Sequence, residues 1–419
     1  MLLSALLGVL VLVLSWGRSG GGDAADTAEQ GALAQASAAS LAKPLVAASA
    51  MAVAVPASGP VIAASALAQV ELPIGVPLWL QQLARQPVCT PQDLSRPAAH
   101  SRASAGEAPW GAEAQALAQQ RLRLTAERLT ASSDAELRMM GLVLLRQHET
   151  LTQEALQQHS STAMYGLLHL CEGWAMMTVH KPLPVPAVCA SLTPERAWPM
   201  SSLDRFGLAL QGLASAQDEA SRDLWLERAV QHPPQITPLD RLPAAMLAHV
   251  PPKWSPEQRA DALAFGFGFW ATQVMAGLQG LTNACRPDKA APGSLRQHRC
   301  LAIAEAMDRP PSTMLAARVA LRLGEWHGWG LQRLQQRHLE LAASVVALPA
   351  WMPNGVDGQV PDSCTGLSGL RDHTVLLASQ GELGALAHGV KRSGKSWAQW
   401  AQELPPFQPR PWQAPASAP

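Results

Sequence analysis

The chain has 419 residues, and 48% of them are hydrophobic, which is enough apolar material for a packed core and for one to three domains. This composition excludes a wholly disordered chain. The 32 basic residues balance the 32 acidic ones, so the chain lacks the basic excess with which proteins bind a phosphate backbone. We therefore expect no nucleic-acid partner.

The N-terminus, residues 1–18, is typical of an export signal or a membrane anchor. Leu2 to Trp16 is almost uninterrupted apolar sequence, and Arg18 follows it. As a helix, these 15 residues span roughly 22 Å against a hydrocarbon core of about 30 Å, a length that suits a signal better than an anchor. The residues that follow offer no A-x-A cleavage site, which favours an uncleaved anchor. Both alternatives predict a periplasmic protein, in the second case anchored in the inner membrane by residues 2–16.

Residues 19–72 are rich in Ala, Ser, Gly and Pro, a composition typical of a flexible linker. Within them, residues 45–68 are apolar enough to resemble a second membrane segment, but two prolines and a glycine argue against a continuous helix. An alternative places the true signal here, with Lys43 before the apolar run and an Ala-Leu-Ala cleavage site at 66–68.

Residues 73–404 have repeatedly helical apolar spacing, and they precede a Pro-rich tail, 405–419, that is predicted to be disordered. The clearest stripe predicts one long helix through Leu263, Phe267, Trp270, Val274, Leu278 and Leu281. Further stripes run through Leu203, Phe206, Leu210 and Leu213, through Met164, Leu168, Cys171 and Trp174, through Leu315, Val319, Leu323 and Trp326, and through Leu334, Leu341 and Val345. No run alternates with period two for long enough to predict a sheet, so the predicted fold class is all-α.

The stretch AFGFGFW at 264–270 alternates aromatic residues with Gly, and as a strand it would place its Phe side chains on one face. Because it lies inside the clearest helical stripe, we predict a helix here too. Gly266 and Gly268 would then allow a neighbouring helix to approach closely.

Residues 206–234 carry the clearest repeat fragment, FGLALQGLASAQDEASRDLWLERAVQHPP. It resembles a tetratricopeptide-type unit at four signature positions, Phe206, Leu226, Ala229 and Pro234. It departs from that pattern at Leu210, Leu213 and Arg222, and it does not recur at a fixed period. The stretches QHSSTAMYGLLHLC, RCLAIAEAM and GELGALAHGVKRSGKSWAQWAQE are also similar to uncharacterised exported helical proteins of Gram-negative bacteria. The first resemblance implies an array of helical hairpins, either TPR-like or an irregular α-solenoid.

All six Cys residues lie after the apolar N-terminus, an even number that fits disulfides in an oxidising compartment. The predicted pairs are Cys171 with Cys189, Cys285 with Cys300, and Cys89 with Cys364. The first two pairs each join consecutive helices across a loop that contains Pro, with Cys285 ending one helix and Cys300 opening the next. The third pair follows by elimination. The alternative is buried free thiols, while zinc is disfavoured because no C-x-x-C occurs.

Gly389 to Ser396, GVKRSGKS, matches the phosphate-binding pattern G-x-x-x-x-G-K-[ST] letter for letter. A working phosphate loop needs a strand before it and further strands elsewhere, whereas the preceding sequence is helical and only 23 residues follow Ser396. We predict a helix C-terminus instead, with Gly394 in the left-handed conformation. Ser396 then begins the next helix, and Gln399 completes a capping box. We accordingly expect no nucleotide cofactor.

Two catalytic patterns are incomplete or misplaced. His148-Glu149 lacks the second His of a zinc-protease helix, because Thr152 occupies that place. Ser40 and Lys43 have the spacing of a Ser–Lys catalytic pair, but they lie in the predicted linker.

Candidate metal ligands also have plainer interpretations. His169, Cys171 and His180 could surround a metal, but a disulfide is the better use of Cys171. His327 lies between two Trp residues, which favours packing in the core or in a groove. Residues 354–358, NGVDG, predict tight turns because the ligand spacing of a calcium loop is missing. The sequence therefore predicts no catalytic, cofactor or metal residue.

The predicted architecture indicates only a broad class of function and no specific activity. Stacked helical hairpins expose extended surfaces, so we expect a periplasmic protein that binds other proteins or acts as a scaffold. The alternative is an exported hydrolase with no recognisable motif. A pocket that gathers titratable groups would favour the enzyme, and a groove lined by exposed Trp and Leu would favour binding. Membrane contact is expected through the N-terminal segment only.

Overall fold

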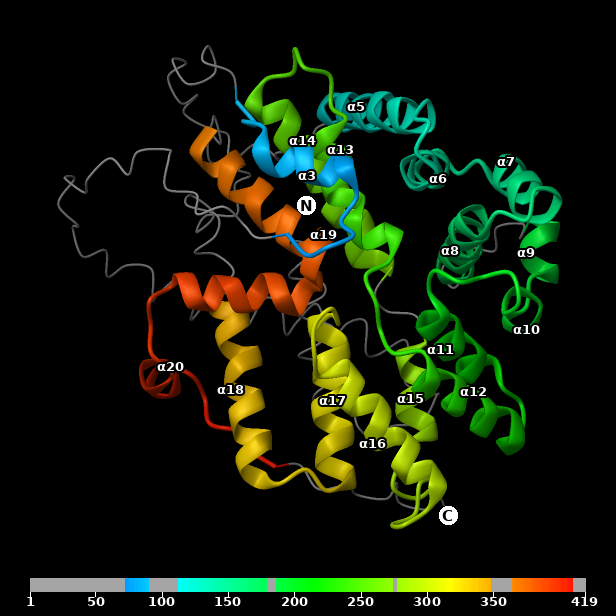
Figure 1. Ribbon diagram of the computed structural model, residues 1–419, viewed down its shortest axis with the longest axis vertical. Helices are drawn as coiled ribbons and strands as arrows, with labels where there is room; N and C mark the ends of the chain where they lie inside the picture. Colours follow the sequence, from blue (N-terminus) through cyan, green and yellow to red (C-terminus); the bar gives the residue numbers. More distant parts are fainter. Residues whose placement is uncertain (1–71, 90–111, 179–185, 274–276, 348–363, 410–419) are drawn as a thin grey trace. The chain divides into compact units, whose positions relative to one another are not determined.

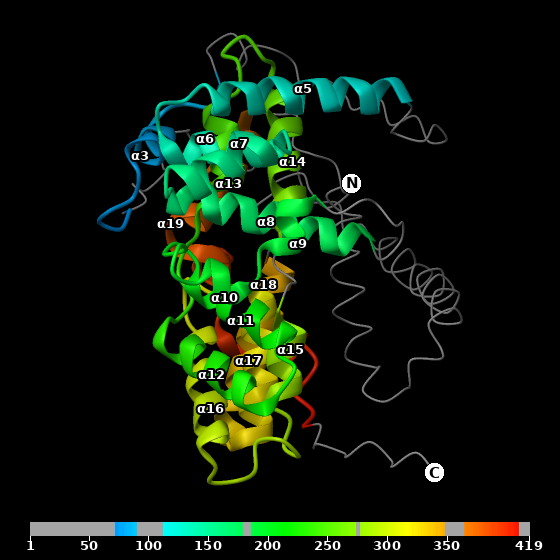
Figure 2. The same cartoon turned by 90° about the vertical axis from the view of Figure 1, so that its right-hand side faces the viewer.

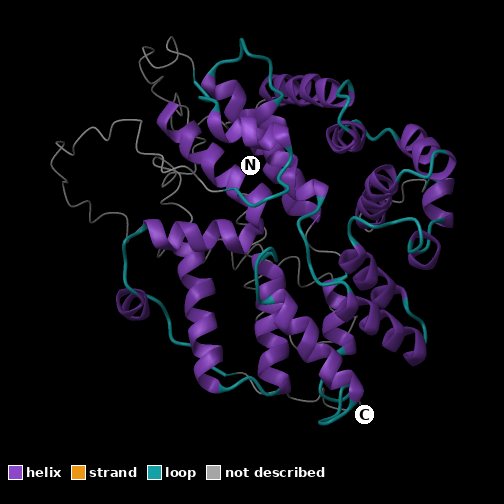
Figure 3. Cartoon of the chain, in the orientation of Figure 1, coloured by secondary structure: helices purple, strands orange, loops and turns teal. Residues whose placement is uncertain are grey.

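The computed structural model describes residues 72–89, 112–178, 186–273, 277–347 and 364–409. Within these ranges every regular element is helical, and Figure 3 shows helices joined by loops without a strand. The prediction of an all-α fold is therefore confirmed. The apolar segment at 2–16 and nearly all of the predicted linker lie outside the described residues.

Helices follow one another along the described chain, with loops between them (Figure 1). The longer helices are α5 (Ala112–Thr130), α6 (Ala135–Leu144), α8 (Ser161–Thr178), α11 (Arg205–Ser215), α12 (Glu219–Gln231), α14 (Pro256–Gln273), α16 (Leu295–Met307), α17 (Met314–His327), α18 (Leu331–Ala347) and α19 (Cys364–Arg392). The shorter elements are α3 (Leu78–Arg85), α7 (His148–Thr152), the π-helical turn η1 (Gln153–Gln157), α9 (Ala187–Ser191), α10 (Pro194–Ala197), the 3₁₀ turn η2 (Pro238–Arg241), α13 (Leu242–Ala248), α15 (Leu278–Ala284) and α20 (Trp397–Glu403).

Side-chain caps fix where many of these helices begin. The Asp134 carboxylate accepts hydrogen bonds from the backbone N–H groups of Glu136 and Leu137, at 2.9 and 3.1 Å. The same role is taken at the starts of α11, α12, α16, α17 and α20 by Asp204, Asp218, Ser294, Thr313 and Ser396. Each cap satisfies a backbone donor that has no partner inside the helix, so the side chain before the first turn sets the helix start.

Many consecutive helices pack against each other, among them α5 with α6, α11 with α12, α13 with α14 and α16 with α17. In the α11–α12 pair, Gly212 lies against the indole of Trp225, and a side chain at this position would collide with the ring. Phe206, Leu226 and Ala229, which carry the tetratricopeptide resemblance, are buried. The two helices of that fragment thus pack together, while membership of a repeat family stays a prediction.

The long helix α19 connects distant parts of the chain. It is kinked at Gly381, whose φ of 75° and ψ of 175° are not helical. A side chain at Gly381 would collide with the backbone of Pro311, and Leu383 N–H donates to the Ser312 carbonyl at 3.1 Å. Besides α18, α19 packs against α3 and α13, which both Figure 1 and Figure 2 show near it. A linear repeat predicts contacts between neighbours only, so this closure is a departure from it.

The prediction of one long helix starting near Leu263 is wrong in its length. α14 ends at Gln273, and α15 begins after Gly277, whose φ of 82° is left-handed. A Cβ on Gly277 would lie 2.6 Å from the Leu210 Cβ, so close packing on α11 also requires glycine. The stripe is divided accordingly, because Leu263 packs with α3 and α19 residues and Leu278 packs with α11 and α16 residues. Periodicity predicted the burial but not the break.

The AFGFGFW stretch lies in α14 and is helical, as predicted. A Cβ on Gly266 would lie 2.9 Å from the Cα of Pro243 in α13, so the predicted close approach of a helix is confirmed at this residue. The same prediction is wrong for Gly268, where no atom of the described residues lies within 4 Å of an added Cβ. Of the two glycines, only Gly266 thus meets a neighbouring helix in the part of the chain that the structure describes.

The ends of the folded region bear on two further predictions. Phe407, in the predicted tail, packs beside the ring of His338, with ring centroids 5.4 Å apart. The first residues of the Pro-rich tail therefore belong to the packed structure, although they form no regular element. Among the helices of the described ranges, none combines the length and the hydropathy needed to cross a bilayer.

Candidate functional site

A cavity of about 740 Å³ opens between α7, η1 and α9. This volume falls in the range of small-ligand sites, but the cavity is open to solvent rather than enclosed. Its lining within the described residues is mostly polar: Arg146, Gln147, His148, Glu149, Thr152, Gln153, Gln157, Pro186, Ala187 and Val188. We call this cavity the α7–α9 pocket.

One wall of the α7–α9 pocket has an unusual backbone. Arg146 has a φ of 55°, a left-handed conformation that residues other than Gly rarely adopt. The N–H of Gln147 donates to the Leu142 carbonyl at 2.9 Å, which ends α6 and turns the chain into α7. α7 then continues directly into the π-helical turn η1, and His159 beyond it has a φ of 54°. Such π-turns and left-handed residues are frequent at functional sites.

The opposite wall is α9, which a disulfide holds in place. Cys189 in α9 is bonded to Cys171 in α8, with their Cα atoms 5.1 Å apart. α8 in turn packs against α7 and η1. A helix as short as α9 is not stable by itself, so its position depends on this bond. The shape of the α7–α9 pocket is therefore tied to the Cys171–Cys189 disulfide.

The polar lining is organised along one helix face. Glu149, Gln153 and Gln157 follow one another at intervals of four residues, and all three are exposed. Thr152 differs, because its hydroxyl is buried and has no hydrogen-bond partner among the described residues. Each glutamine offers a donor and an acceptor, and Arg146 and Glu149 carry opposite charges. The lining can therefore form hydrogen bonds with a polar ligand of low net charge.

A second polar group involves carboxyls on α8, before α11 and on α19. The pKa of Glu172 is raised to about 7, first by burial and then by the charge of Asp204, while a hydrogen bond from Gln211 at 3.0 Å lowers it. Burial raises the pKa of Asp204 to about 6 and that of Glu382 to about 7. Glu382 accepts a hydrogen bond from Met314 N–H at 2.8 Å, at the start of α17. All three residues are half-buried, and we call Glu172, Asp204 and Glu382 the half-buried carboxyls.

A chain of hydrogen bonds links α8 to η2 and α14 beside these carboxyls. Tyr165 Oη donates to Thr237 Oγ1 at 2.9 Å, and Thr237 Oγ1 donates to the Asp240 carboxylate at 2.7 Å. Trp270 Nε1 donates to the other Asp240 oxygen at 3.1 Å. The ring of Tyr165 meets the ring of His169 edge-on, with centroids 4.4 Å apart. Burial raises the pKa of Tyr165 well above its ordinary value, so its hydroxyl stays a donor.

The six cysteines form disulfides in the three predicted pairs. The Cα–Cα distances are 5.8 Å for Cys89–Cys364, 5.1 Å for Cys171–Cys189 and 5.7 Å for Cys285–Cys300. One detail of the prediction is wrong, because Cys300 does not open its helix. Ser294 caps α16, which begins at Leu295 and therefore places Cys300 inside the helix.

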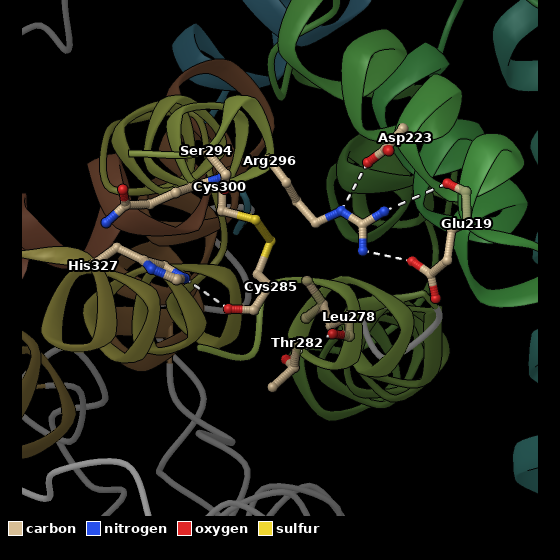
Figure 4. Close-up of a disulfide and its surroundings, with 10 residues drawn as sticks. Glu219, Asp223, Leu278, Thr282, Cys285, Ser294, Arg296, Cys300 and His327 are labelled. Atoms are coloured by element: carbon tan, nitrogen blue, oxygen red, sulfur yellow. Dashed lines mark hydrogen bonds and ion pairs between the residues drawn. A yellow bond between two sulfur atoms is a disulfide. The ribbon is translucent and has the colours of Figure 1, made fainter. Parts of the chain in front are cut away.

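Figure 4 shows what surrounds the Cys285–Cys300 bond. The Cys285 carbonyl oxygen lies 2.6 Å from His327 Nε2, and His327 is buried, so the prediction that this histidine packs in the core is confirmed. On α16, Arg296 binds Asp223 at 2.7 Å and Glu219 at 2.5 Å, both on α12. α16 is thus held to α12 by ion pairs, while its disulfide joins it to the end of α15.

The phosphate-loop match forms the predicted helix junction. α19 ends two residues before Gly394, whose φ of 70° is left-handed. Ser396 Oγ accepts from Gln399 N–H at 3.3 Å, and Gln399 Oε1 accepts from Ser396 N–H at 2.7 Å, which completes the capping box. Lys395 pairs with Glu403 at 2.6 Å. The distinctive residues of the motif therefore have structural roles at the start of α20.

The other sequence candidates are dispersed. His148, Glu149 and Thr152 lie in α7 and line the α7–α9 pocket. His169 Nδ1 lies 3.9 Å from Glu172 Oε2, next to the disulfide-bonded Cys171. No group of His, Cys, Asp or Glu side chains that could hold a metal is found in the ranges that the structure describes. Ser40, Lys43, His180 and residues 354–358 lie outside those ranges.

Sequence reasoning missed both the α7–α9 pocket and the half-buried carboxyls. A signal for the second was present, because Tyr165, His169 and Glu172 are spaced by four and three residues and form a polar stripe on a largely apolar helix. Tyr165 and Glu172 bind Thr237 at the start of η2 and Gln211 in α11, and no local pattern connects these residues. The chain matches no protein-family model, and no curated protein and no solved structure matches it.

Proposed function

We propose that the protein is an exported binding protein that takes up an extended segment of a partner protein in the α7–α9 pocket. The observation that supports this is the exposed row of Glu149, Gln153 and Gln157. Four residues of an α-helix rise about 6 Å along its axis, and alternate residues of an extended chain are spaced about 6.7 Å. Glu149 lies in α7, whereas Gln153 and Gln157 lie in the wider π-helical turn η1, so the three side chains are spaced unevenly along the row. An extended peptide laid along the row can therefore meet more than one of these side chains.

Carboxamides suit recognition of a peptide main chain. Gln153 and Gln157 each offer an N–H donor and a carbonyl acceptor, and a peptide unit offers the complementary pair. Glu149 adds an acceptor and Arg146 adds donors at the same wall. Hydrogen bonds to the main chain do not depend on the peptide's sequence. Sequence preference would come from apolar contacts between peptide side chains and Val188 and its neighbours in the α9 wall.

The compartment is part of the same proposal. Three disulfides in one chain are compatible with a location outside the cytoplasm, because reducing conditions inside cells disfavour them. The N-terminal apolar segment at 2–16 supports export, with the periplasm as the predicted destination and other proteins as the partners.

Binding to an array of immobilised short peptides of varied sequence tests this function. We expect a subset of peptides to bind and N-methylation of alternate residues to abolish binding, because it removes main-chain donors. Gln153→Ala combined with Gln157→Ala should weaken binding at least about tenfold. The matched control is Gln332→Ala combined with Gln335→Ala, two exposed glutamines on α18, which should leave binding unchanged. The proposal fails if no peptide binds, or if both double variants bind alike.

A second candidate function, the exported hydrolase, is favoured by one observation. Glu172 has a pKa of about 7, which suits a group that exchanges protons at neutral pH, and it lies beside Gln211 and His169. Hydrolysis of ester, amide or glycoside test substrates that is lost in Glu172→Gln, with peptide binding retained, would favour this alternative over the binding protein.

A further inference from the structure

Aromatic and cationic side chains meet where α10 ends, α11 begins and α12 ends. Trp198 directly follows α10, Arg205 is the first residue of α11, and Arg228 and His232 lie at the end of α12. The guanidinium carbons of Arg205 and Arg228 lie 5.5 and 4.6 Å from the Trp198 ring centroid. The His232 ring centroid lies 5.4 Å from the same indole, in an edge-on arrangement. Three groups that carry or can acquire positive charge thus surround one indole.

Arg228 is held by aromatic rings rather than by acceptors. Its guanidinium also lies 4.2 Å from the Trp225 ring centroid, and the two indoles meet edge-on with centroids 5.5 Å apart. Its Nη1 is buried and has no hydrogen-bond partner among the described residues. A buried charged donor without an acceptor costs free energy, so a water or an ion is the expected partner of such a group.

Carboxylates do not neutralise this cluster in the part of the chain that the structure describes. Arg205 Nε donates to the Ser201 carbonyl at 3.3 Å, and neither Arg205 nor Arg228 has an ion pair there. Asp204, next to Arg205 in sequence, accepts from Gly207 N–H at 2.8 Å, and no arginine lowers its pKa. The pKa of His232 is lowered, first by partial burial and then by the charge of Arg205. The positive charge of the cluster is therefore uncompensated.

The arginines of α16 that face α12 differ from Arg228 because they bind carboxylates. Arg299 of α16 binds Glu227 of α12 at 2.7 Å, one residue before Arg228. Arg296 binds Asp223 and Glu219 on the preceding turns. The carboxylates of α12 thus form ion pairs with arginines of α16, and none of them forms an ion pair with Arg228.

We propose that Arg205, Arg228 and His232 bind an oxyanion beside Trp198, either a carboxylate or a phosphate group. The planar guanidinium group presents paired donors that match two oxygens of such an anion. Trp198 and Trp225 hold the Arg228 guanidinium in one orientation through cation–π contacts. The paired N–H donors of this guanidinium are therefore already oriented before an anion binds. The site shares no residue with the α7–α9 pocket and stands independently of the proposed function.

An NMR titration of the full chain tests this site. The Trp198 indole N–H signal is followed during titration with sodium acetate and, separately, with sodium phosphate, at an ionic strength held constant with sodium chloride. We expect a saturable shift with at least one anion, and the two arms distinguish a carboxylate site from a phosphate site. Arg228→Met should weaken binding at least about tenfold. Arg228→Lys should give an intermediate loss, because lysine keeps the positive charge but lacks the paired N–H donors of the guanidinium group.

The control is Arg196→Met, which removes an arginine of α10 that contacts the Ser191 carbonyl, and it should bind as the parent does. If Arg228→Met does not fold, Arg205→Met carries the test, since Arg205 makes only one backbone hydrogen bond in the described structure. No saturable shift with either anion overturns the proposal. Equal affinity in Arg205→Met, Arg228→Met and Arg196→Met overturns it as well.

Discussion

Two regions of the protein shift the pKa values of their carboxyl groups in opposite directions. Between α12 and α16, Arg296 and Arg299 bind carboxylates, and the pKa of Glu219 is lowered, first by the Arg296 hydrogen bond. For the half-buried carboxyls, by contrast, burial is the largest effect, and it raises the pKa of Glu172 to about 7. We call these the paired region and the half-buried carboxyl region.

The difference means that pH acts on the two regions with opposite sign. A carboxyl whose folded pKa is lowered contributes stability above its ordinary pKa of 4.5, and this stability is lost as the pH falls through the folded pKa. A carboxyl whose folded pKa is raised contributes most below 4.5, and that contribution is lost as the pH rises to about 7. The same residue type therefore stabilises one region and destabilises the other at neutral pH.

The largest effects on stability are expected from removing a disulfide, and the comparison is between a bond beside the paired region and a bond at the start of α19. Cys285–Cys300 closes a separation of 15 residues beside the paired region, and Cys89–Cys364 closes one of 275 residues at the start of α19. The entropy of loop closure gives about 3 kcal/mol for the short loop and about 6 kcal/mol for the long one. We expect Cys89→Ser with Cys364→Ser to lower the denaturant midpoint more than Cys285→Ser with Cys300→Ser.

Peptide mapping of non-reduced protein is the control for these variants, since it establishes the pairing in the parent chain. Far-ultraviolet circular dichroism should show that helical content survives each loss, because apolar burial supplies most of the stabilisation. A larger effect from the short-range pair would mean that native contacts, rather than loop entropy, decide the stabilisation.

The second test separates the two regions by pH. Glu172→Gln keeps an acceptor for Gln211 but cannot ionise, so it should remove the loss of stability between pH 4.5 and about 7. For a shift of this size the gain at pH 8 relative to the parent is about 3 kcal/mol. Denaturant unfolding at a series of pH values measures it.

The matched variant in the paired region is Glu219→Gln, which should have the opposite sign. It removes ion pairs to Arg222 and Arg296, so it should destabilise above pH 4.5 and have no effect well below it. Glu219 is exposed, and the effect should therefore be small. Parallel pH profiles for the two variants would contradict the division into two regions.

Much of the fold could be predicted from local pattern. The helical stripes through Val319 and Leu341 lie on helices with both residues buried, and the capping box at Ser396 is present. Short-range cysteine pairs were predictable because a loop with prolines brings consecutive helices together, although Cys171 and Cys300 lie inside their helices. These features depend on residues close in sequence, where spacing alone carries the information.

The parts that failed depend on residues far apart in sequence. The start of α15 at Gly277 is set by the left-handed backbone of that glycine and by Leu210 on another helix, neither of which changes the apolar period. Glu172 and Glu382 each have a raised pKa because distant helices bury them. The α7–α9 pocket likewise needs α9 to face α7, which only the folded chain shows.

A third test compares glycines in helices. Gly212 lies against Trp225 in the α11–α12 pair, so Gly212→Ala should force the indole to move and destabilise by about 1–3 kcal/mol. Among the described residues, nothing lies within 4 Å of a Cβ added to Gly268 in α14, so Gly268→Ala should stabilise by about 0.5–1 kcal/mol through helix propensity. Thermal unfolding of both variants checks the two signs, and destabilisation by Gly268→Ala would show that α14 packs more tightly than described.

The smallest effects are expected at the α19–α20 junction, where charge lies at the surface and belongs to neither region. Ser396→Ala removes one half of the capping box and should cost about 1 kcal/mol, with fraying of α20. Lys395→Ala removes an exposed ion pair with Glu403 and should cost about 0.2–1 kcal/mol. Because both residues have structural roles in a helix junction, neither change should alter an affinity for ATP or GTP, which we expect to be undetectable by equilibrium dialysis. Nucleotide binding by the parent chain that Lys395→Ala abolishes would restore the phosphate-loop interpretation of GVKRSGKS.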